Sequence, residues 1–191
     1  MTRLPAVLGD GDLPLAELCA ARIDGELMRI GDGWCPVDEP DLPALRAAAA
    51  AAAIPSGLIL ERRTAAWVHG ALPSPPPVVE CCVSHSDRVS MRGLSPALQL
   101  REVAIEAHEV AVIGGIRCTT PERTIHDLVR DPTAAPGVEE LVRGLLAIDA
   151  DAGDRARRRI ERAHRMPHKA LALARLDAAV RAVLDQPSLT R

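Results

Sequence analysis

The chain has 191 residues, a formal net charge of −3 and hydrophobic residues at 48% of its positions. This length suffices for one domain of ordinary size, or two small ones, with a packed core. The sequence lacks Phe and Tyr, and its aromatic residues are Trp34 and Trp67. Binding of single-stranded nucleic acid by base stacking is therefore disfavoured, and aliphatic side chains must fill the core.

The N-terminus shows no basic segment followed by an apolar core, so no signal peptide is expected. No apolar run approaches the roughly 20 residues of a membrane span. The five cysteines are odd in number and irregularly spaced, which is typical of a reduced cytosolic protein and not of a disulfide framework. We expect a cytoplasmic protein with no membrane contact.

Residues 1–72 form the first predicted region. Residues 13–37 predict a helix followed by a small hairpin, because Gly31-Asp32-Gly33 is a strong turn signal between two strand candidates. Helices are predicted from Asp41 to about Ala53 and from Glu61 to Val68. Four prolines then form a stiff linker and the predicted boundary, at positions 73, 75, 76 and 77.

The second predicted region, 78–150, begins with strands and ends with helices. Strand-forming residues occupy 78–83, 98–105 and 109–118, and the helical patterns follow at 121–130 and 137–149. The third region, 151–191, is predicted to be a helical tail. Its two helices span 154–165 and 167–184, separated by Pro167.

Residues 114–130 carry the most informative local pattern. Gly114-Gly115 indicates a turn or bulge within a strand, and the strand runs into a helix that Thr120 caps and Pro121 begins. Arg123 and Asp127 lie one helical turn apart, so an ion pair between them is expected. The buried stripe of this helix is predicted to be Ile125, Leu128 and Val129.

Thr119-Thr120-Pro121-Glu122-Arg123-Thr124, followed by Asp127-Leu128, resembles a signature of actinobacterial proteins related to the AbiEi antitoxins of type IV toxin–antitoxin systems. Glu26 to Pro36 resembles the wing of that family's N-terminal winged helix, and Thr64 to Gly70 resembles one of its helices. The resemblance extends over most of residues 14–150. Within it, Thr120, Pro121, Arg123 and Asp127 are interpreted as a structural motif.

The resemblance implies an antitoxin or transcriptional regulator that binds DNA and a nucleotidyltransferase-type toxin. A full winged helix has about three helices before its wing, whereas 25 residues precede Glu26 here. The endonuclease domain that ends larger relatives is not recognisable. We therefore predict an α+β fold with a truncated winged-helix-like N-terminal part, a small mixed α/β middle domain and a helical C-terminal tail.

Basic charge is concentrated near the C-terminus. Residues 155–191 hold nine arginines and Lys169 against three carboxylates, whereas residues 1–154 hold 13 arginines against 23 carboxylates. Residues spaced by three or four positions share a helical face, and such a row suits the phosphates of duplex DNA. The candidate nucleic-acid-binding residues are Arg155, Arg158, Arg159, Arg162, Arg165 and Lys169.

Three alternatives to DNA binding stay open for this basic segment. The segment packs against the acidic part of the chain, is simply solvated, or contacts an acidic protein partner. Two rival functions also stay open: a protein-interaction module that has lost DNA binding, and a nuclease-related enzyme. A homodimer is a further open alternative.

No catalytic residues, metal ligands or cofactors are predicted. Cys81-Cys82-x-x-His85 lacks the paired cysteine knuckles of a zinc site, and Cys81 is interpreted as a small core residue. The sequence has no G-x-S-x-G elbow, phosphate-binding glycine loop or H-E-x-x-H pair, so we do not expect an enzyme. His126 is expected on a solvated helix face, unable to pair with the adjacent Asp127.

Overall fold

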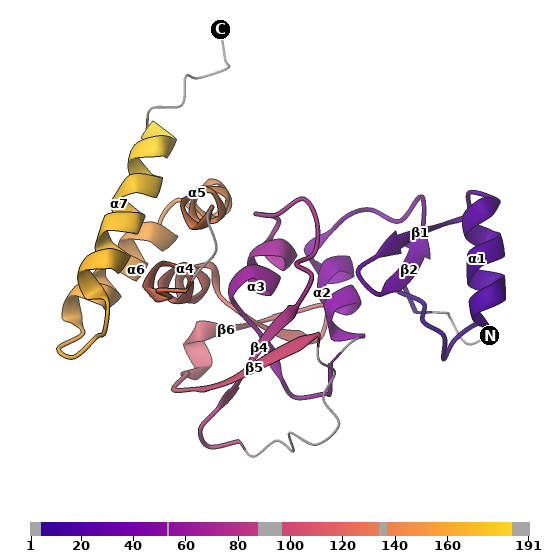
Figure 1. The fold of residues 1–191 in the computed structure, drawn as a ribbon, viewed down its shortest axis with the longest axis horizontal. Helices are drawn as coiled ribbons and strands as arrows, with labels where there is room; N and C mark the ends of the chain where they lie inside the picture. The colour runs from indigo at the N-terminus through magenta and orange to yellow at the C-terminus, as the bar shows by residue number, and fades with distance from the viewer. Residues whose placement is uncertain (1–4, 53, 88–96, 134–136, 185–191) are drawn as a thin grey trace, which may run out of the picture.

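The computed structural model describes residues 5–52, 54–87, 97–133 and 137–184. Within these ranges the chain forms seven α-helices, a five-stranded sheet and a two-stranded sheet. Figure 1 shows three parts in a row: a helix and hairpin at the N-terminal end, the large sheet with two helices in the middle, and a helical layer at the C-terminal end. The fold therefore mixes helices and strands, as predicted, whereas the winged-helix-like character of the N-terminal part stays a prediction.

The N-terminal part consists of α1 (Leu15–Ile23) and an antiparallel hairpin of β1 (Leu27–Ile30) and β2 (Gly33–Pro36). Gly31 has a φ of 57°, which glycine adopts without steric cost and which the tight turn requires. Trp34 is buried between the hairpin and α1, in a small cluster with Leu8 and Leu18. The predicted helix and hairpin are confirmed.

The five-stranded sheet has the strand order β5-β4-β3-β7-β6. Strand β3 pairs with β4 antiparallel and with β7 parallel, while β5 runs parallel to β4 and β6 antiparallel to β7. The elements of this middle part are α2 (Pro43–Ala51), β3 (Ile59–Leu60), α3 (Arg62–His69), β4 (Val79–Ser84), β5 (Leu98–Val103), the 3-10 helix η1 (Ala107–Glu109), β6 (Val110–Ile113) and β7 (Ile116–Thr119).

The predicted strand at 109–118 is two strands joined by a turn at Gly114-Gly115. These glycines have φ values of 57° and 84°, which suit the two-residue turns that match the twist of a hairpin. Gly114 also lies against α2, since an added Cβ would be 3.1 Å from the Ala44 Cβ. The turn therefore fixes both the hairpin and its contact with α2.

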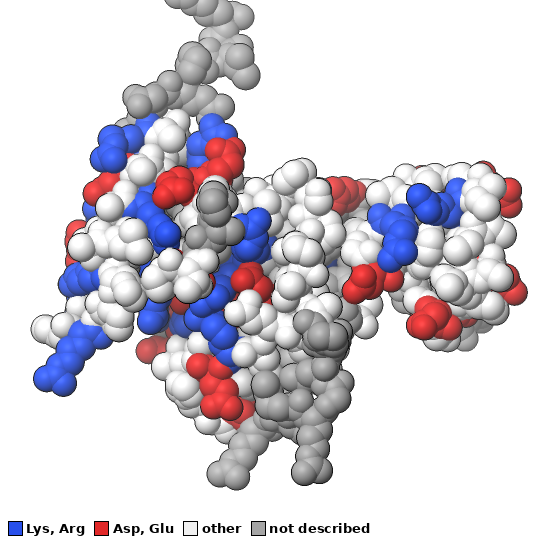
Figure 2. All heavy atoms as spheres, viewed as in Figure 1, with Lys and Arg blue, Asp and Glu red and all other residues white. Residues whose placement is uncertain are grey.

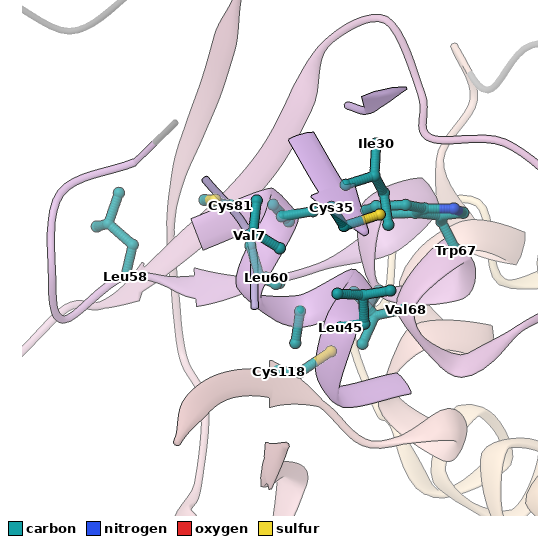
Figure 3. Close-up of a cluster of buried hydrophobic side chains, with 14 of the residues drawn as sticks. Val7, Ile30, Cys35, Leu45, Leu58, Leu60, Trp67, Val68, Cys81 and Cys118 are labelled. Atoms are coloured by element: carbon teal, nitrogen blue, oxygen red, sulfur yellow. The ribbon is translucent and has the colours of Figure 1, made fainter. Parts of the chain in front are cut away.

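Small side chains let the alanine-rich α2 pack closely on the sheet. Ala47 and Leu45 belong to the central core, which Figure 3 shows between the sheet strands, α3 and the hairpin. Cys35 and Ile30 of the hairpin lie in the same cluster as Trp67 of α3, so the N-terminal part shares this core. The hairpin is therefore held on one side by this core and on the other by the small cluster around Trp34.

The C-terminal layer contains four helices around a second core. Residues of all four are buried together, including Ile125, Leu145, Ile160 and Leu176. The helices are α4 (Pro121–Arg130), α5 (Val138–Ile148), α6 (Ala152–Arg162) and α7 (Lys169–Leu184). The helices predicted near the C-terminus are present, and they pack on α4 and α5 (Figure 1). The division into regions 1–72, 78–150 and 151–191 stays a prediction.

Among the residues that the structure describes, no helix combines the length and apolar character that crossing a bilayer requires.

Replacing Gly144 with Ala is expected to destabilise the protein. A Cβ at this position of α5 would lie 2.9 Å from the Ala71 Cβ and 3.0 Å from the Ala71 Cα, so backbone must move. Overpacking costs about 1–3 kcal/mol, and the better helix propensity of Ala offsets about 1 kcal/mol. We expect Gly144→Ala to lower the free energy of unfolding by about 1 kcal/mol net in urea titrations.

Gly153→Ala is the matched control. Its added Cβ would meet the Leu146 Cδ2 at 2.7 Å, but that is the end of a flexible side chain that can rotate away. The loss should therefore be smaller than for Gly144→Ala, and an equal or larger loss would contradict the close approach of α5 to the backbone of Ala71, just after α3.

Candidate functional site

Helix α4 begins as the sequence predicts and carries the centre of the site. Thr120 is the N-cap residue, its side chain accepts a hydrogen bond from the Arg123 backbone N–H at 3.4 Å, and Pro121 occupies the first turn. The Thr124 hydroxyl lies 2.7 Å from the Thr119 hydroxyl, which ties the helix start to β7. The predicted buried stripe is confirmed for Ile125, Leu128 and Val129.

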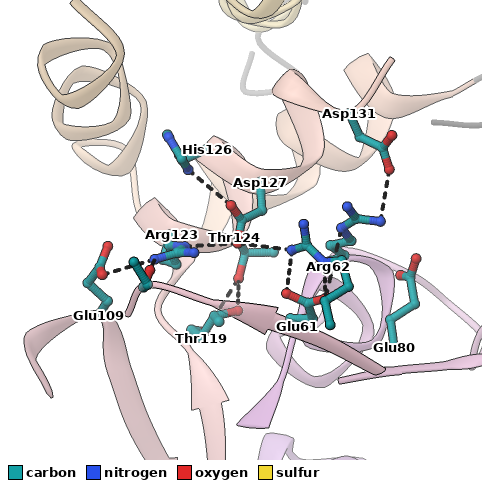
Figure 4. Close-up of polar contacts among 12 residues, drawn as sticks. Glu61, Arg62, Glu80, Glu109, Thr119, Arg123, Thr124, His126, Asp127 and Asp131 are labelled. Carbon is teal, nitrogen blue, oxygen red and sulfur yellow. Dashed lines mark hydrogen bonds and ion pairs between the residues drawn. The ribbon is translucent and has the colours of Figure 1, made fainter. Parts of the chain in front are cut away.

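Arg123 joins α4 to the edge of the sheet. Its side chain is only 3% exposed, and it donates to Asp127 Oδ2 at 2.8 Å, confirming the expected ion pair. It also donates to Glu109 Oε2 at 2.9 Å and to the Ala104 carbonyl oxygen at 3.0 Å. One guanidinium thus connects α4 with η1 and the segment that follows β5, as Figure 4 shows for Glu109.

A second buried ion pair links the sheet to α3. Arg101 of β5 donates from Nε to Glu61 Oε1 at 2.6 Å and from Nη2 to Glu61 Oε2 at 2.5 Å. Its Nη2 also lies 3.6 Å from Asp127 Oδ2, which connects this pair to that of Arg123. Such bidentate guanidinium–carboxylate contacts are strong and directional. The sequence does not indicate this pair, because Arg101 and Glu61 are 40 residues apart.

Arg62 and Asp131 extend the network toward the end of α4. Arg62 has a φ of 47°, a region that side-chain-bearing residues rarely occupy. Its Nη1 lies 2.9 Å from Asp131 Oδ2, whereas its buried Nε is 3.9 Å from Glu61 Oε1, too far for a hydrogen bond. The surrounding ion pairs hold this residue in a strained conformation.

The network balances its charges. Its basic members are Arg62, Arg101, Arg123 and Arg159, and its acidic members are Glu61, Glu109, Asp127 and Asp131. Removing one partner of a buried ion pair costs about 3–5 kcal/mol, because the other charge is left unpaired. The network therefore fixes how α4 and α6 sit on the sheet.

The expectation that His126 lies on a solvated face, unable to pair with Asp127, is wrong. His126 is 5% exposed, and its Nδ1 lies 3.1 Å from Asp127 Oδ1. Neighbouring Cβ atoms on a helix do point about 100° apart, but the two carboxylate oxygens of Asp127 diverge. Oδ1 contacts His126 and Oδ2 contacts Arg123, while α6 packs over this side of α4.

Burial and neighbouring charge act against each other on the pKa values of these groups. Burial would raise the pKa of Asp127, but the hydrogen bond with His126 and the charge of Arg123 hold that pKa well below its usual range. Burial lowers the pKa of His126, and Asp127 only partly counteracts it. At neutral pH, Asp127 is therefore charged and His126 is neutral. Burial also raises the pKa of Glu61 despite the Arg101 ion pair.

Above this network lies a groove of about 910 Å³. It is bounded by β5 and η1 on one side and by α6 and the residues after it on the other, with α4 as its floor. Four carboxylates and three histidines line it together with arginines, and Figure 2 shows basic side chains gathered where the helical layer meets the sheet. Its eight arginines are Arg101, Arg123, Arg130, Arg155, Arg158, Arg159, Arg162 and Arg165.

We use the name arginine groove for this site. The structure places five of the six candidate binding residues in the groove. Four of them lie on α6, and the fifth, Arg165, follows the end of that helix. Lys169 does not line the groove, because its Nζ donates to the carbonyl oxygens of Glu161 and Ala163, at 2.7 and 3.0 Å. Lys169 thus caps the C-terminal end of α6.

Internal ion pairs neutralise part of the basic segment. Arg155 donates to Glu122 at 3.2 Å and to Asp149 at 2.5 Å, and Arg159 pairs with Glu109. Within the described parts of the chain, four groove arginines have side chains that form no ion pair or hydrogen bond. These are Arg130, Arg158, Arg162 and Arg165.

The cysteines do not contribute to the groove. Cys81 and Cys82 are buried in the sheet, and burial raises the pKa of the Cys81 thiol to about 12. Cys35 and Cys118 are buried as well, whereas Cys19 on α1 is exposed. Within the described residues, no group of three or more His, Cys, Asp or Glu side chains is arranged to hold a metal ion.

The sequence model of the AbiEi antitoxin C-terminal domain matches residues 51–176, which include the buried network and the arginine groove. The protein therefore belongs to a family of antitoxins. That family is the AbiEi antitoxin C-terminal domain family, as the Thr119–Leu128 signature suggests.

The crystal structure of the RV2827C protein from Mycobacterium tuberculosis resembles this fold. The two chains are 20% identical, with a TM-score of 0.50, and the similarity covers 92% of this chain and 72% of that one. The likeness extends beyond the matched domain into the N-terminal part. No curated protein matches the chain.

The buried His126 predicts loss of stability in mild acid. Its pKa is lowered in the folded protein, so the unfolded chain binds the proton first and stability falls as pH drops below about 6.5. His126→Asn keeps a donor for Asp127 but does not titrate. We expect its free energy of unfolding, from urea titrations between about pH 7 and about pH 5, to fall less steeply than that of the wild type.

His164→Asn, which removes an exposed histidine, is the control and should keep the wild-type slope. Glu61 has a raised pKa and contributes with the opposite sign, but it is present in all three proteins and cancels in the comparison. Equal slopes for His126→Asn and the wild type would show that His126 is not held neutral.

Proposed function

We propose that this protein is an antitoxin or transcriptional regulator that acts by binding, with the arginine groove as its contact surface for an anionic partner. The observation that carries the proposal is that the groove arginines form two groups, one paired within the fold and one unpaired. Some groove arginines are neutralised within the fold, while Arg130, Arg158, Arg162 and Arg165 are left without partners in the described structure. Such unpaired arginines suit carboxylates or phosphates of a second molecule.

Family membership supports the antitoxin role, and two kinds of partner agree with it: duplex DNA, for a regulator, and the nucleotidyltransferase-type toxin. The N-terminal α1 and its hairpin agree with a truncated winged helix. However, Asp24, Glu26 and Asp32 surround this hairpin, and they would repel a DNA backbone. We therefore assign binding to the groove and not to the hairpin.

A rival function, a nuclease-related enzyme, finds less support in the geometry. The buried carboxylates Glu61, Glu109 and Asp127 all contact arginines. A carboxylate that is already committed to a guanidinium is a poor general base. The groove is thus better suited to binding than to acid–base chemistry.

Replacing Arg158 and Arg162 together with Ala tests the proposal. Both side chains are exposed and unpaired within the described residues, so the fold should be retained. Binding of purified protein to its promoter duplex and to its cognate toxin is measured by fluorescence anisotropy. Whichever probe binds the wild type should bind the double variant at least about tenfold more weakly, since two charge-assisted contacts are lost.

If the duplex binds, the slope of log K against log salt concentration should shrink by about 2, near 0.9 per lost phosphate contact. The matched control is Arg22→Ala with Arg181→Ala, which removes two exposed arginines outside the groove. A groove variant that binds both probes as the wild type does would refute the assignment, as would a control that loses as much affinity.

A further inference from the structure

The arginine groove has two walls of opposite charge. Arg158, Arg162 and Arg165 form the wall contributed by α6 and the residues after it, which we call the basic wall. Glu102 of β5 and Glu106 before η1 line the opposite side, which we call the acidic wall. The groove is therefore not a uniformly basic surface.

The acidic wall is open to solvent. The Glu102 and Glu106 side chains are 72% and 79% exposed. Their ion-pair partners are His85, at 4.0 Å from Glu102, and His108, at 3.4 Å from Glu106, and these partners are charged only when protonated. The Glu106 side chain also caps η1 by accepting a hydrogen bond from the Glu109 backbone N–H, and both carboxylates stay exposed to a molecule that enters the groove.

A nucleic-acid backbone does not match this distribution. Its phosphates carry charge of a single sign, so contact with the basic wall would bring it toward Glu102 and Glu106. Like charges brought together at an interface are costly, and proteins use them to reject unwanted partners. A protein segment, in contrast, can present acidic residues on one side and basic residues on the other.

We propose that the arginine groove receives a segment of the partner toxin that carries acidic side chains toward the basic wall and basic side chains toward the acidic wall. This inference rests on the proposed antitoxin function and names the partner of the same site. Arg158 and Arg162 lie one turn apart on α6, a spacing that faces acidic residues three or four positions apart on a helical segment. Arg130 adds a contact at the end of the groove floor.

The test reverses each wall separately. The basic-wall variant is Arg158→Glu with Arg162→Glu. The acidic-wall variant is Glu102→Lys with Glu106→Gln, because Gln keeps the side-chain oxygen that caps η1. The control, Asp24→Lys with Glu26→Gln, makes the same charge change outside the groove. Thermal unfolding checks that each variant folds.

The dissociation constant of each protein is then measured for the purified cognate toxin and for the promoter duplex. We expect each wall variant, but not the control, to bind the toxin at least about tenfold more weakly. The acidic-wall variant should bind the duplex more tightly than the wild type does, since a repulsive wall has been removed.

Other outcomes overturn the inference in distinguishable ways. Toxin binding that neither wall variant weakens places the toxin elsewhere and leaves the antitoxin function intact. Duplex binding that the basic-wall variant abolishes, without any toxin binding, makes the groove a nucleic-acid site. If the wild type binds neither probe, both the inference and the proposed function fail.

Discussion

The structure depends on burying charged groups in pairs at the junction of the sheet and the helical layer. Arg123 is nearly inaccessible to water, yet it contacts carboxylates from two elements and a backbone carbonyl oxygen. Desolvating a guanidinium is expensive, and only well-placed partners offset that cost. Helix α4 therefore has one position on the sheet in which all these groups are satisfied, and a shifted position would leave charges unpaired.

The same pairing decides which arginines face outward. Glu109 holds Arg159 while Glu122 and Asp149 hold Arg155, so α6 is fixed in rotation about its own axis. In this orientation of α6, Ala156 and Ile160 are buried in the second core. Arg158 and Arg162 then line the groove. The ion pairs beneath the groove thus decide which arginines are available on its surface. An arginine that pairs with a carboxylate of the same chain makes the fold more rigid but does not add to the affinity for a partner.

Local features were predictable from the sequence because their causes are local. The start of α4 follows from Thr120 and Pro121, and the β6–β7 turn follows from Gly114-Gly115, since caps and tight turns depend on a few adjacent residues. The pair Arg123–Asp127 follows from helical spacing. The arginine row was also visible, because its members lie within one helix and the residues after it.

The partners that tertiary structure brings together were not predictable. Glu61 and Arg101 are 40 residues apart, and strand β3, only two residues long, leaves no periodic signal yet sets the middle of the sheet. His126 was misassigned because its burial depends on α6, which packs on α4 from some 30 residues away. A row of basic residues likewise gives no indication of which members are already neutralised, or that carboxylates face them across a groove.

The distribution of cysteines has a practical consequence for studying this molecule. Four thiols are buried and the fifth, Cys19, is exposed on α1, at the end of the molecule away from the arginine groove (Figure 1). Thiol reagents act on the thiolate, which burial suppresses. A maleimide dye should therefore attach to Cys19 alone in the folded protein. Labelling of any further cysteine would measure the fraction of molecules that have unfolded.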